Sequence, residues 1–161
     1  MQSPDTILPS RTLLLGIGNA LLSDDGAGIH VIEALRPSLP HVTVRDGGTI
    51  GLALLADIED CDALIAVDAM ELGEAPGTVQ LFQGDAMDAQ LAGNKRTAHE
   101  VALADLLQAA ELIGRKPVRR ALVGIQPKET HWGLAPTPPV ANGIAVACAQ
   151  VTTLLKEWHD A

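Results

Sequence analysis

The sequence predicts an α/β domain, a three-layer sandwich in which a twisted, mostly parallel sheet of five strands lies between helices on both faces. Two observations support this fold class. Short apolar runs typical of strands alternate along the chain with segments whose apolar residues repeat at the helical period. In the first half of the chain, each helical segment joins two strand-like runs, and such β-α-β units place their strands in a parallel sheet.

Five elements are expected in the first half: a strand at residues 12–17, a helix at 26–35, a strand at 42–45, a helix at about 52–58 and a strand at 63–67. The first and third strands, TLLLGI and ALIAV, are apolar throughout, as strands buried on both faces should be. The first helix carries apolar residues at Ile29, Ile32 and Leu35, and Pro37 ends it.

Four elements are expected in the second half: a strand at 78–83, a helix at 101–113, a strand at 119–125 and a helix at about 140–158. Polar and apolar residues alternate in the strand at 78–83, which indicates an edge of the sheet. The polar stretch 84–96 is expected to connect this strand to the next helix without an element of its own. A capping box from Thr97 to Glu100 begins that helix, and Gly114 ends it.

Composition and charge exclude several classes of protein. The net charge of −9 argues against nucleic acid or an anionic membrane surface as partner, because both need a basic protein surface. Cys61 and Cys148 are too few for a disulfide scaffold or a zinc ribbon, so we expect free thiols in a reducing cytoplasm. Residues 1–11 are polar and lack a basic n-region. We therefore expect a loose tail followed by a single soluble, cytoplasmic domain at 12–161.

Acidic residues follow the first three predicted strands. Asp24 and Asp25 come after the first strand, Asp46 after the second and Asp68 after the third. Ligands of parallel sheets bind outside the carboxyl ends of the strands. If the strand order is 2-1-3, Asp25 and Asp68 face each other across one crevice. Asp24 is expected to cap the first helix, whereas Asp68 interrupts an apolar run, where a charge is costly unless it is paired or bound to a cation.

His99 completes a candidate metal site. It lies in the first turn of its helix, where the helix dipole favours the neutral imidazole that binds metals. Two carboxylates and one imidazole with open positions suit a first-row divalent metal ion. They do not form a closed structural zinc site, which needs four ligands and usually thiolates.

Five stretches, in this order and spacing, resemble one enzyme family: GIGNALLSDDGAGI, DGGTIG, ALIAVDAM, AHEVALADLL, and VGIQP with GLAPT. The chain is similar over nearly its whole length to the nickel-iron hydrogenase maturation endopeptidases. The resemblance implies an enzyme that removes a C-terminal extension from the hydrogenase large-subunit precursor after nickel has been inserted. It implies the nickel-containing precursor as partner and nickel supplied by that precursor as the metal. It implies no nucleotide cofactor, and we expect the free protein to be a monomer.

The resemblance also implies the residues of the site. The family's acid in the glycine loop, its aspartate after the third strand and its histidine at a helix start correspond to Asp25, Asp68 and His99, as both metal-binding and catalytic residues. Many family members have glutamate at the first position, and aspartate here is a shorter arm with the same ligand chemistry. The residues expected to contact the substrate are those of the second glycine turn, Asp46, Gly47, Gly48 and Thr49. Either nickel or an aspartate could activate the water.

Three other functions are compatible with parts of the sequence. A non-proteolytic accessory protein could hold or deliver nickel with the same three residues. A peptidyl-tRNA hydrolase-like enzyme would share the G-x-G-N start, but its RNA substrate needs a positive groove. A nucleotide-binding regulator would need a third glycine where the chain has Leu21.

Overall fold

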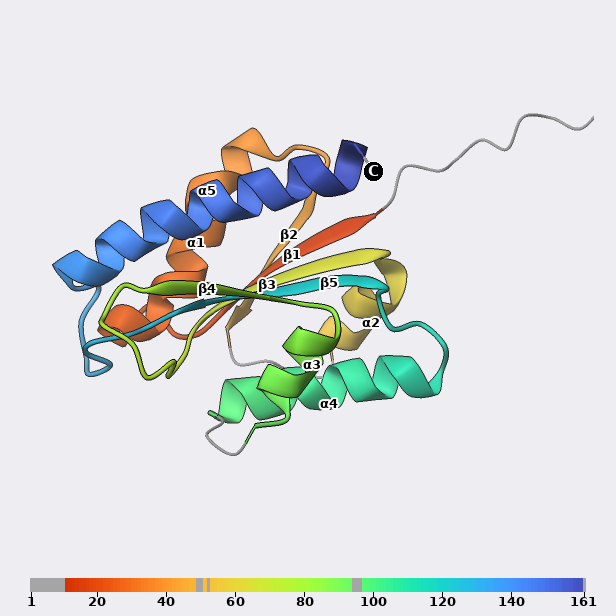
Figure 1. Cartoon of the computed structure of the whole chain (residues 1–161), viewed down its shortest axis with the longest axis horizontal. Coiled ribbons are helices and arrows are strands. Elements are labelled where there is room, and N and C mark those ends of the chain that lie inside the picture. The colour runs from red at the N-terminus through yellow and green to blue at the C-terminus, as the bar shows by residue number, and fades with distance from the viewer. Residues whose placement is uncertain (1–10, 49–50, 52, 94–96, 161) are drawn as a thin grey trace, which may run out of the picture.

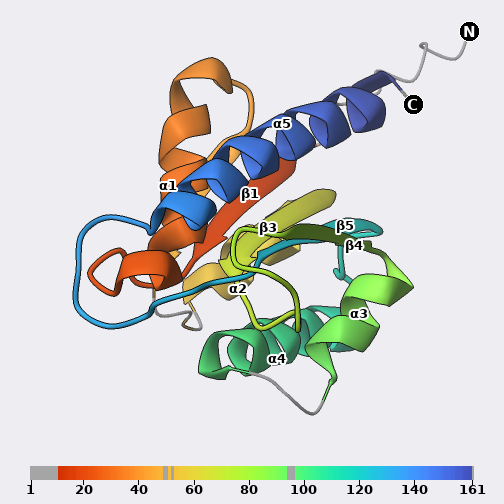
Figure 2. The same ribbon diagram turned by 60° about the vertical axis from the view of Figure 1, so that its left-hand side comes forward.

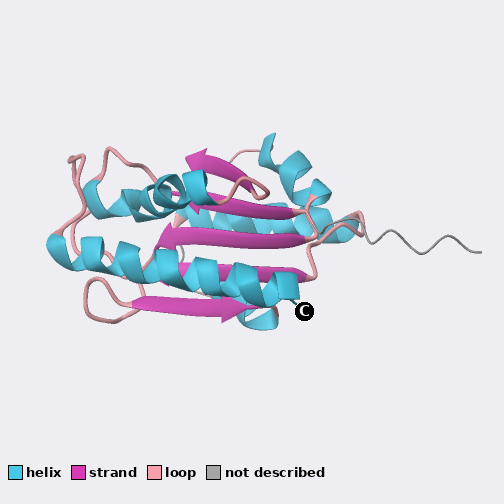
Figure 3. Cartoon of the chain, turned by 90° about the horizontal axis from the view of Figure 1, so that it is seen from above, coloured by secondary structure: helices cyan, strands magenta, loops and turns pink. Residues whose placement is uncertain are grey.

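Five strands form one sheet in the order β2-β1-β3-β5-β4. The structure, a computed structural model, describes residues 11–48, 51, 53–93 and 97–160. The strands are β1 (Thr12–Ile17), β2 (Thr43–Gly48), β3 (Ala63–Ala69), β4 (Val79–Gln83) and β5 (Arg119–Ile125). All neighbours are parallel except β4, which runs antiparallel to β5 at the edge of the sheet (Figure 3). The predicted fold class, the 2-1-3 order and the edge position of the fourth strand are confirmed.

Helices cover both faces of the sheet (Figure 1). The α-helices are α1 (Ala27–Leu35), α2 (Ala53–Asp60), α3 (Asp85–Leu91), α4 (Ala98–Leu112) and α5 (Pro138–Asp160), and the two short 3-10 helices are η1 (Ser23–Gly26) and η2 (Arg36–Ser38). Helices α1 and α5 lie on one face, and α2, α3 and α4 lie on the other. Successive side chains of a strand point to opposite faces, so the continuous apolar run of β1 supplies both cores, with Leu13 and Leu15 in one and Leu14 in the other.

The long C-terminal helix α5 packs against α1 and over β5 and β4. By length and composition alone it could cross a membrane. Its buried residues nevertheless recur on one face at helical spacing. Four of them, Val140, Ala147, Val151 and Leu154, belong to the core beside α1, and the fifth, Gly143, lies against the backbone of Gly77. This arrangement is that of a core helix of a globular domain.

Two predicted strand ends are wrong, and one helix was not predicted. β2 continues through Gly48, because residues 46–48 pair with the end of β1 across a register shift. β3 continues through Ala69, so Asp68 lies within the strand and pairs with Gly124 of β5. The stretch 84–96 contains helix α3, which buries Met87 and Leu91, four positions apart on one helical face. In these places pairing and burial in the folded chain outweigh a local sequence that is rich in glycine or polar residues.

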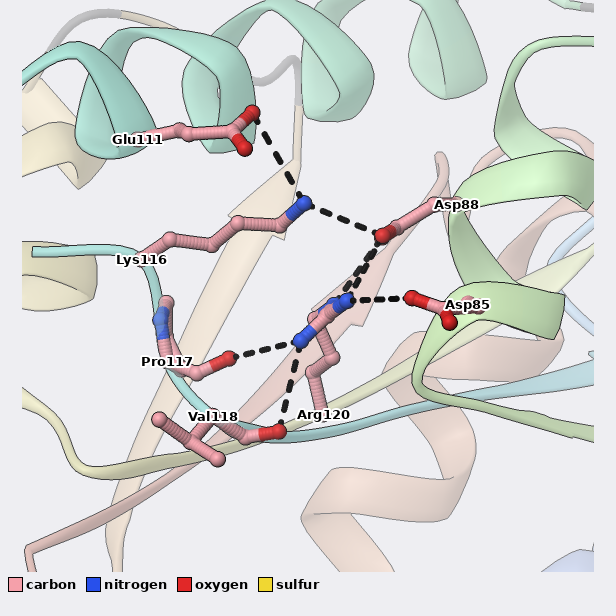
Figure 4. Close-up of polar contacts among 7 residues, drawn as sticks. All are labelled: Asp85, Asp88, Glu111, Lys116, Pro117, Val118 and Arg120. Atoms are coloured by element: carbon pink, nitrogen blue, oxygen red, sulfur yellow. Dashed lines mark hydrogen bonds and ion pairs between the residues drawn. The ribbon is translucent and has the colours of Figure 1, made fainter.

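A group of ion pairs holds α3 against the start of β5 (Figure 4). Arg120 donates from Nε to Asp88 Oδ1 at 2.9 Å and from Nη2 to Asp88 Oδ2 at 2.6 Å. Lys116 Nζ lies 3.0 Å from the same Oδ2. The hydrogen bond from Arg120, working against partial burial, holds the pKa of Asp88 below its ordinary value. The bidentate geometry and the small exposure of Arg120 make this pair a structural contact rather than a loose surface one.

Candidate active site

The loop after β1 is folded tightly against the ends of two strands. A Cβ atom on Gly28 would lie 2.1 Å from the Val67 carbonyl oxygen and 2.6 Å from that of Ile17, so only glycine lets α1 begin directly on β1 and β3. Gly18 has φ +123°, and a Cβ there would lie 2.0 Å from the carbonyl oxygen of Asp25. These two glycines therefore fix Asp25 beside the carboxyl end of β3.

Asp68 is the most deeply placed of the predicted site residues. It is 1% exposed, and its Oδ1 atom is buried without a hydrogen-bond partner among the residues that the structure describes. Burial raises the pKa of Asp68 well above its ordinary value. The negative charges of Glu100 and Asp25 raise it further, and a hydrogen bond from the Ala69 N–H offsets part of the rise. An unpartnered oxygen on a buried carboxyl group is costly, and such groups occur where a ligand or a proton is to be bound.

Two other carboxyl groups lie close enough to Asp68 for their charges to interact with it. Asp25 is half-buried, and its Oδ2 accepts a 3.0 Å hydrogen bond from the N–H of Asn19. Glu100 is 2% exposed in the first turn of α4. The sequence assigned Glu100 only to a capping box, whose Thr97 Oγ1 does accept from the Glu100 N–H at 3.3 Å. The position of Glu100 directly after the candidate ligand His99 was the sequence signal that could have added it to the site.

His99 occupies the first turn of α4, as predicted from the capping box, and it is half-buried. Within the described ranges, no three His, Cys, Asp or Glu side chains are grouped so that they could hold a metal ion. The structure thus brings Asp25 and Asp68 together, whereas His99 does not complete a group of three ligands with them. The assignment of these residues as ligands and catalysts stays a prediction.

A surface hollow of about 330 Å³ lies beside the loop that carries Asp25. It is lined by Gly18, Asn19, Ala20, Leu21, Ile29, Asp46 and Gly48. Two of the residues predicted to contact substrate, Asp46 and Gly48, therefore face a space that a ligand could enter. Gly47 instead is buried against β1, and Thr49 lies outside the described residues. The hollow joins the first glycine loop to the end of β2.

Comparison with known proteins identifies the family. A family model described as hydrogenase maturation protease matches residues 29–154. The chain is 41% identical to hydrogenase 2 maturation protease of Escherichia coli K12, over 91% of this chain and 92% of that protein. It is 36% identical to the hydrogenase expression/formation protein HupD of Bradyrhizobium diazoefficiens, over 96% and 83% of the two chains. The chain belongs to the hydrogenase maturation protease family.

Solved structures of this family have the same fold. The hydrogenase maturating endopeptidase HybD of E. coli superposes with a TM-score of 0.84 at 37% identity, covering 91% of this chain and 93% of that one. The [NiFe] hydrogenase maturation protease HybD of Thermococcus kodakarensis superposes with a TM-score of 0.79 at 26% identity, covering 89% and 98%. The resemblance on which the sequence-based prediction depends is confirmed, and the chain is an endopeptidase of this family.

In this family member, Asp24 does not cap the first helix. The N-cap of α1 is Gly26, without a side-chain cap. Asp24 is instead fully buried, and its carboxylate accepts hydrogen bonds from residues of the loop between β5 and α5: the N–H groups of Lys128, Glu129 and Thr137 and the hydroxyl of Thr137, at 2.7–3.1 Å. Burial alone would raise the pKa of Asp24, but these hydrogen bonds hold it below its ordinary value. The ionised carboxylate of Asp24 therefore links the loop before α1 to the loop between β5 and α5.

Backbone hydrogen bonds continue this contact between the two loops. The N–H of Ser23 donates to the Gly133 carbonyl at 2.8 Å, and the N–H of Gly133 donates to the Leu21 carbonyl at 2.9 Å. The Ser23 hydroxyl donates to the carbonyl of His131 at 2.8 Å. Figure 2 shows the β5–α5 loop, in light blue, beside the loop before α1, in orange-red. These hydrogen bonds hold the loop before α1, which carries Asp25, against the β5–α5 loop.

Proposed function

We propose that this protein is the endopeptidase that recognises nickel in a hydrogenase large-subunit precursor and removes the precursor's C-terminal extension. Membership of the hydrogenase maturation protease family supports the reaction and the class of substrate. The observation that carries the site is the buried Asp68 at the carboxyl end of the sheet, whose Oδ1 has no hydrogen-bond partner among the described residues. It lies within charge range of Asp25, and the loop that carries Asp25 lines, through Gly18 and Asn19, a hollow that a polypeptide can enter.

The electrostatics of the site favour a cation. Three carboxyl groups, those of Asp25, Asp68 and Glu100, interact in a place where two of them are almost fully buried. Burial and the negative charges of Glu100 and Asp25 disfavour the ionised form of Asp68. A divalent cation that arrives with the substrate reverses this balance, because it attracts the carboxylates and accepts oxygen ligands from them. Nickel also accepts imidazole nitrogen, which is the role proposed for His99.

Two routes to hydrolysis use these residues. In one, nickel in the substrate polarises the scissile carbonyl or a bound water. In the other, the carboxylate of Asp68 or Asp25 takes the proton from the attacking water as a general base. The first route predicts that the rate changes when another divalent ion replaces nickel in the precursor. The second predicts a pH–rate profile that follows the aspartate.

The decisive experiment combines the purified protein with purified precursor and measures the precursor's intact mass. Nickel-loaded precursor should lose a C-terminal fragment, and nickel-free precursor should not. Asp25→Ala should abolish the loss while the variant keeps the thermal stability of the wild type. Metal transfer without any change in the precursor's mass would instead identify a nickel-binding accessory protein and refute the protease assignment.

We further propose that the protein acts in the cytoplasm as a monomer. Both cysteines are free, which fits a reducing compartment such as the cytoplasm. Cys61 is buried, and burial raises the pKa of its thiol to about 12, so this thiol is unreactive. Light scattering on the purified protein tests the oligomeric state, and a dimer mass at micromolar concentration would refute it.

A further inference from the structure

Three exposed apolar side chains lie on the two bridged loops beside the candidate active site, and we call them the rim patch: Leu21, Trp132 and Leu134. They are 48%, 77% and 75% exposed. Aromatic residues make up only 2% of the chain, and it has two tryptophans. A tryptophan that leaves most of its surface in water is unusual, and exposed aromatic anchors are typical of protein interfaces.

The rim patch has a fixed backbone. Leu22 and Gly133 form a parallel bridge, so Leu21 lies beside Trp132 across the two loops, and Leu134 follows directly. Hydrogen bonds on both sides of Gly133 hold this bridge. The buried carboxylate of Asp24 holds the same loop at both its ends, near Lys128 and at Thr137. Side chains on a backbone that is already ordered lose less conformational entropy on binding than those on a free loop.

The rim patch is continuous with the hollow that is proposed to receive the substrate. Leu21 belongs to both, because it lines the hollow together with Asp46 and Gly48. An apolar surface next to a peptidase site is placed to hold the polypeptide on one side of the bond that is cut. A second copy of this chain is a poorer occupant, since each copy carries a net charge of −9 and like charges repel.

We infer that Leu21, Trp132 and Leu134 form the docking surface on which the protein substrate places an apolar segment next to the scissile bond. This inference rests on the proposed function, since it names how that same site binds its substrate. Trp132 is the central anchor, and Leu21 and Leu134 exclude water around it. Loss of the patch weakens substrate binding, whereas the carboxyl groups that carry out the reaction stay in place.

Matched variants test the inference. Leu134→Ser removes an apolar side chain from the patch, and Leu112→Ser makes the same change at a similarly exposed position, 84%. Leu112 ends α4, roughly 20 Å along the helix from the buried Glu100, at the opposite end of the sheet (Figure 1). Trp132→Ala removes the central anchor. All three changes are at exposed positions, so thermal melts should match the wild type.

The measurement is the cleavage of nickel-loaded precursor as a function of its concentration. Trp132→Ala should raise KM by about 10- to 100-fold, as expected for an aromatic anchor, and Leu134→Ser should raise it by a smaller factor. The kcat should stay within about 3-fold of the wild type if the patch acts through binding alone. Leu112→Ser should leave both constants unchanged. Patch variants that match Leu112→Ser in KM would overturn the inference.

A direct signal comes from the two tryptophans. In protein labelled with 5-fluorotryptophan, the fluorine resonance of Trp132 should shift when precursor binds, while that of the half-buried Trp158 should not. A shift that depends on the concentration of the protease alone, with a dimer mass by light scattering, would make the patch a contact between copies and overturn the inference. Failure of the wild type to cleave nickel-loaded precursor would instead count against the proposed function, so the two failures are distinguishable.

Discussion

Replacing Asp68 with asparagine should stabilise the fold and abolish activity at the same time. The buried carboxyl group has a raised pKa, an oxygen without a partner among the described residues, and two negative neighbours. Near neutral pH, holding it in the folded protein costs free energy, either to ionise it in place or to protonate it. Asparagine has nearly the same shape and no charge, so this cost disappears.

The pKa shift fixes the sign and the pH dependence of the stabilisation. The carboxyl binds its proton more tightly in the folded chain than in the unfolded chain, whose pKa is near the ordinary 3.8. The wild type therefore loses stability relative to Asp68→Asn as the pH rises above about 4, until the pH reaches the folded-state pKa. Each unit by which the pKa is raised corresponds to about 1.4 kcal/mol, and for a domain of this size to about 3–5 °C in Tm.

The assay is thermal unfolding followed by circular dichroism between pH 4 and pH 8, with precursor cleavage measured in parallel. Asp105→Asn is the matched control, because Asp105 is exposed on the same helix as His99 and the change alters net charge by the same amount. The gain in Tm of Asp68→Asn should shrink toward zero near pH 4, and the control should show no such trend. Cleavage by Asp68→Asn should fall at least about 100-fold, the usual contribution of an acid–base group.

Two results would refute this reasoning. An Asp68→Asn variant that is less stable than the wild type at pH 7 would show that the carboxylate is compensated by contacts that asparagine cannot make. A folded variant that cleaves at the wild-type rate would remove Asp68 from the active site.

Three further predictions concern other parts of the molecule. His99→Ala should keep the wild-type Tm and lose precursor cleavage, measured by intact mass; normal cleavage would exclude it from the site. Asp24→Asn should cost about 2–4 kcal/mol of unfolding free energy, because a charged acceptor for several donors is lost. The pKa of Asp24 is lowered in the fold, so this stabilisation is present above the unfolded-state pKa and is lost as the pH falls through the folded-state pKa. If the unfolding free energies of the wild type and of Asp24→Asn changed equally with pH, the prediction would be contradicted. Arg120→Gln should lower the free energy of unfolding by about 1–3 kcal/mol, measured with denaturant, because it breaks the bidentate pair with Asp88. The control Arg36→Gln, in an exposed ion pair, should change the free energy of unfolding little. Equal effects of the two substitutions would show that the Arg120 pair is only a surface contact.

Elements whose signal is local could be predicted from the sequence. The apolar runs at 12–17 and 119–125 predict β1 and β5 at the bounds that the structure has, since strands buried on both faces need no alternation. The capping box likewise predicts the start of α4, and Thr97 is its N-cap. The 2-1-3 order, which the sequence left as a condition, is the order that the structure has, and it places Asp25 and Asp68 at the same carboxyl end of the sheet.

Features that depend on distant partners could not be predicted. The partners of the Asp24 carboxylate are 104 to 113 residues away in the sequence, and an aspartate before a helix looks like a cap when only its neighbours are considered. The burial of Glu100 and its charge interaction with Asp68 depend on where α4 packs in the folded chain, which its local sequence does not set. Helix α3 shows only two apolar positions, Met87 and Leu91, which is too short a pattern to separate a helix from a polar loop.

The two adjacent aspartates distinguish this glycine loop from a phosphate-binding one. In a nucleotide site, loop N–H groups and the helix start surround an anionic phosphate. Here the carboxylate of Asp24 instead accepts the N–H groups of the loop between β5 and α5. The close approach of Gly28 to Val67 leaves α1 packed on the strand ends. Asp25, one residue after Asp24, places a negative charge near Asp68, and negative charge at this end of the sheet repels a phosphate and supports the proposed binding of a metal ion.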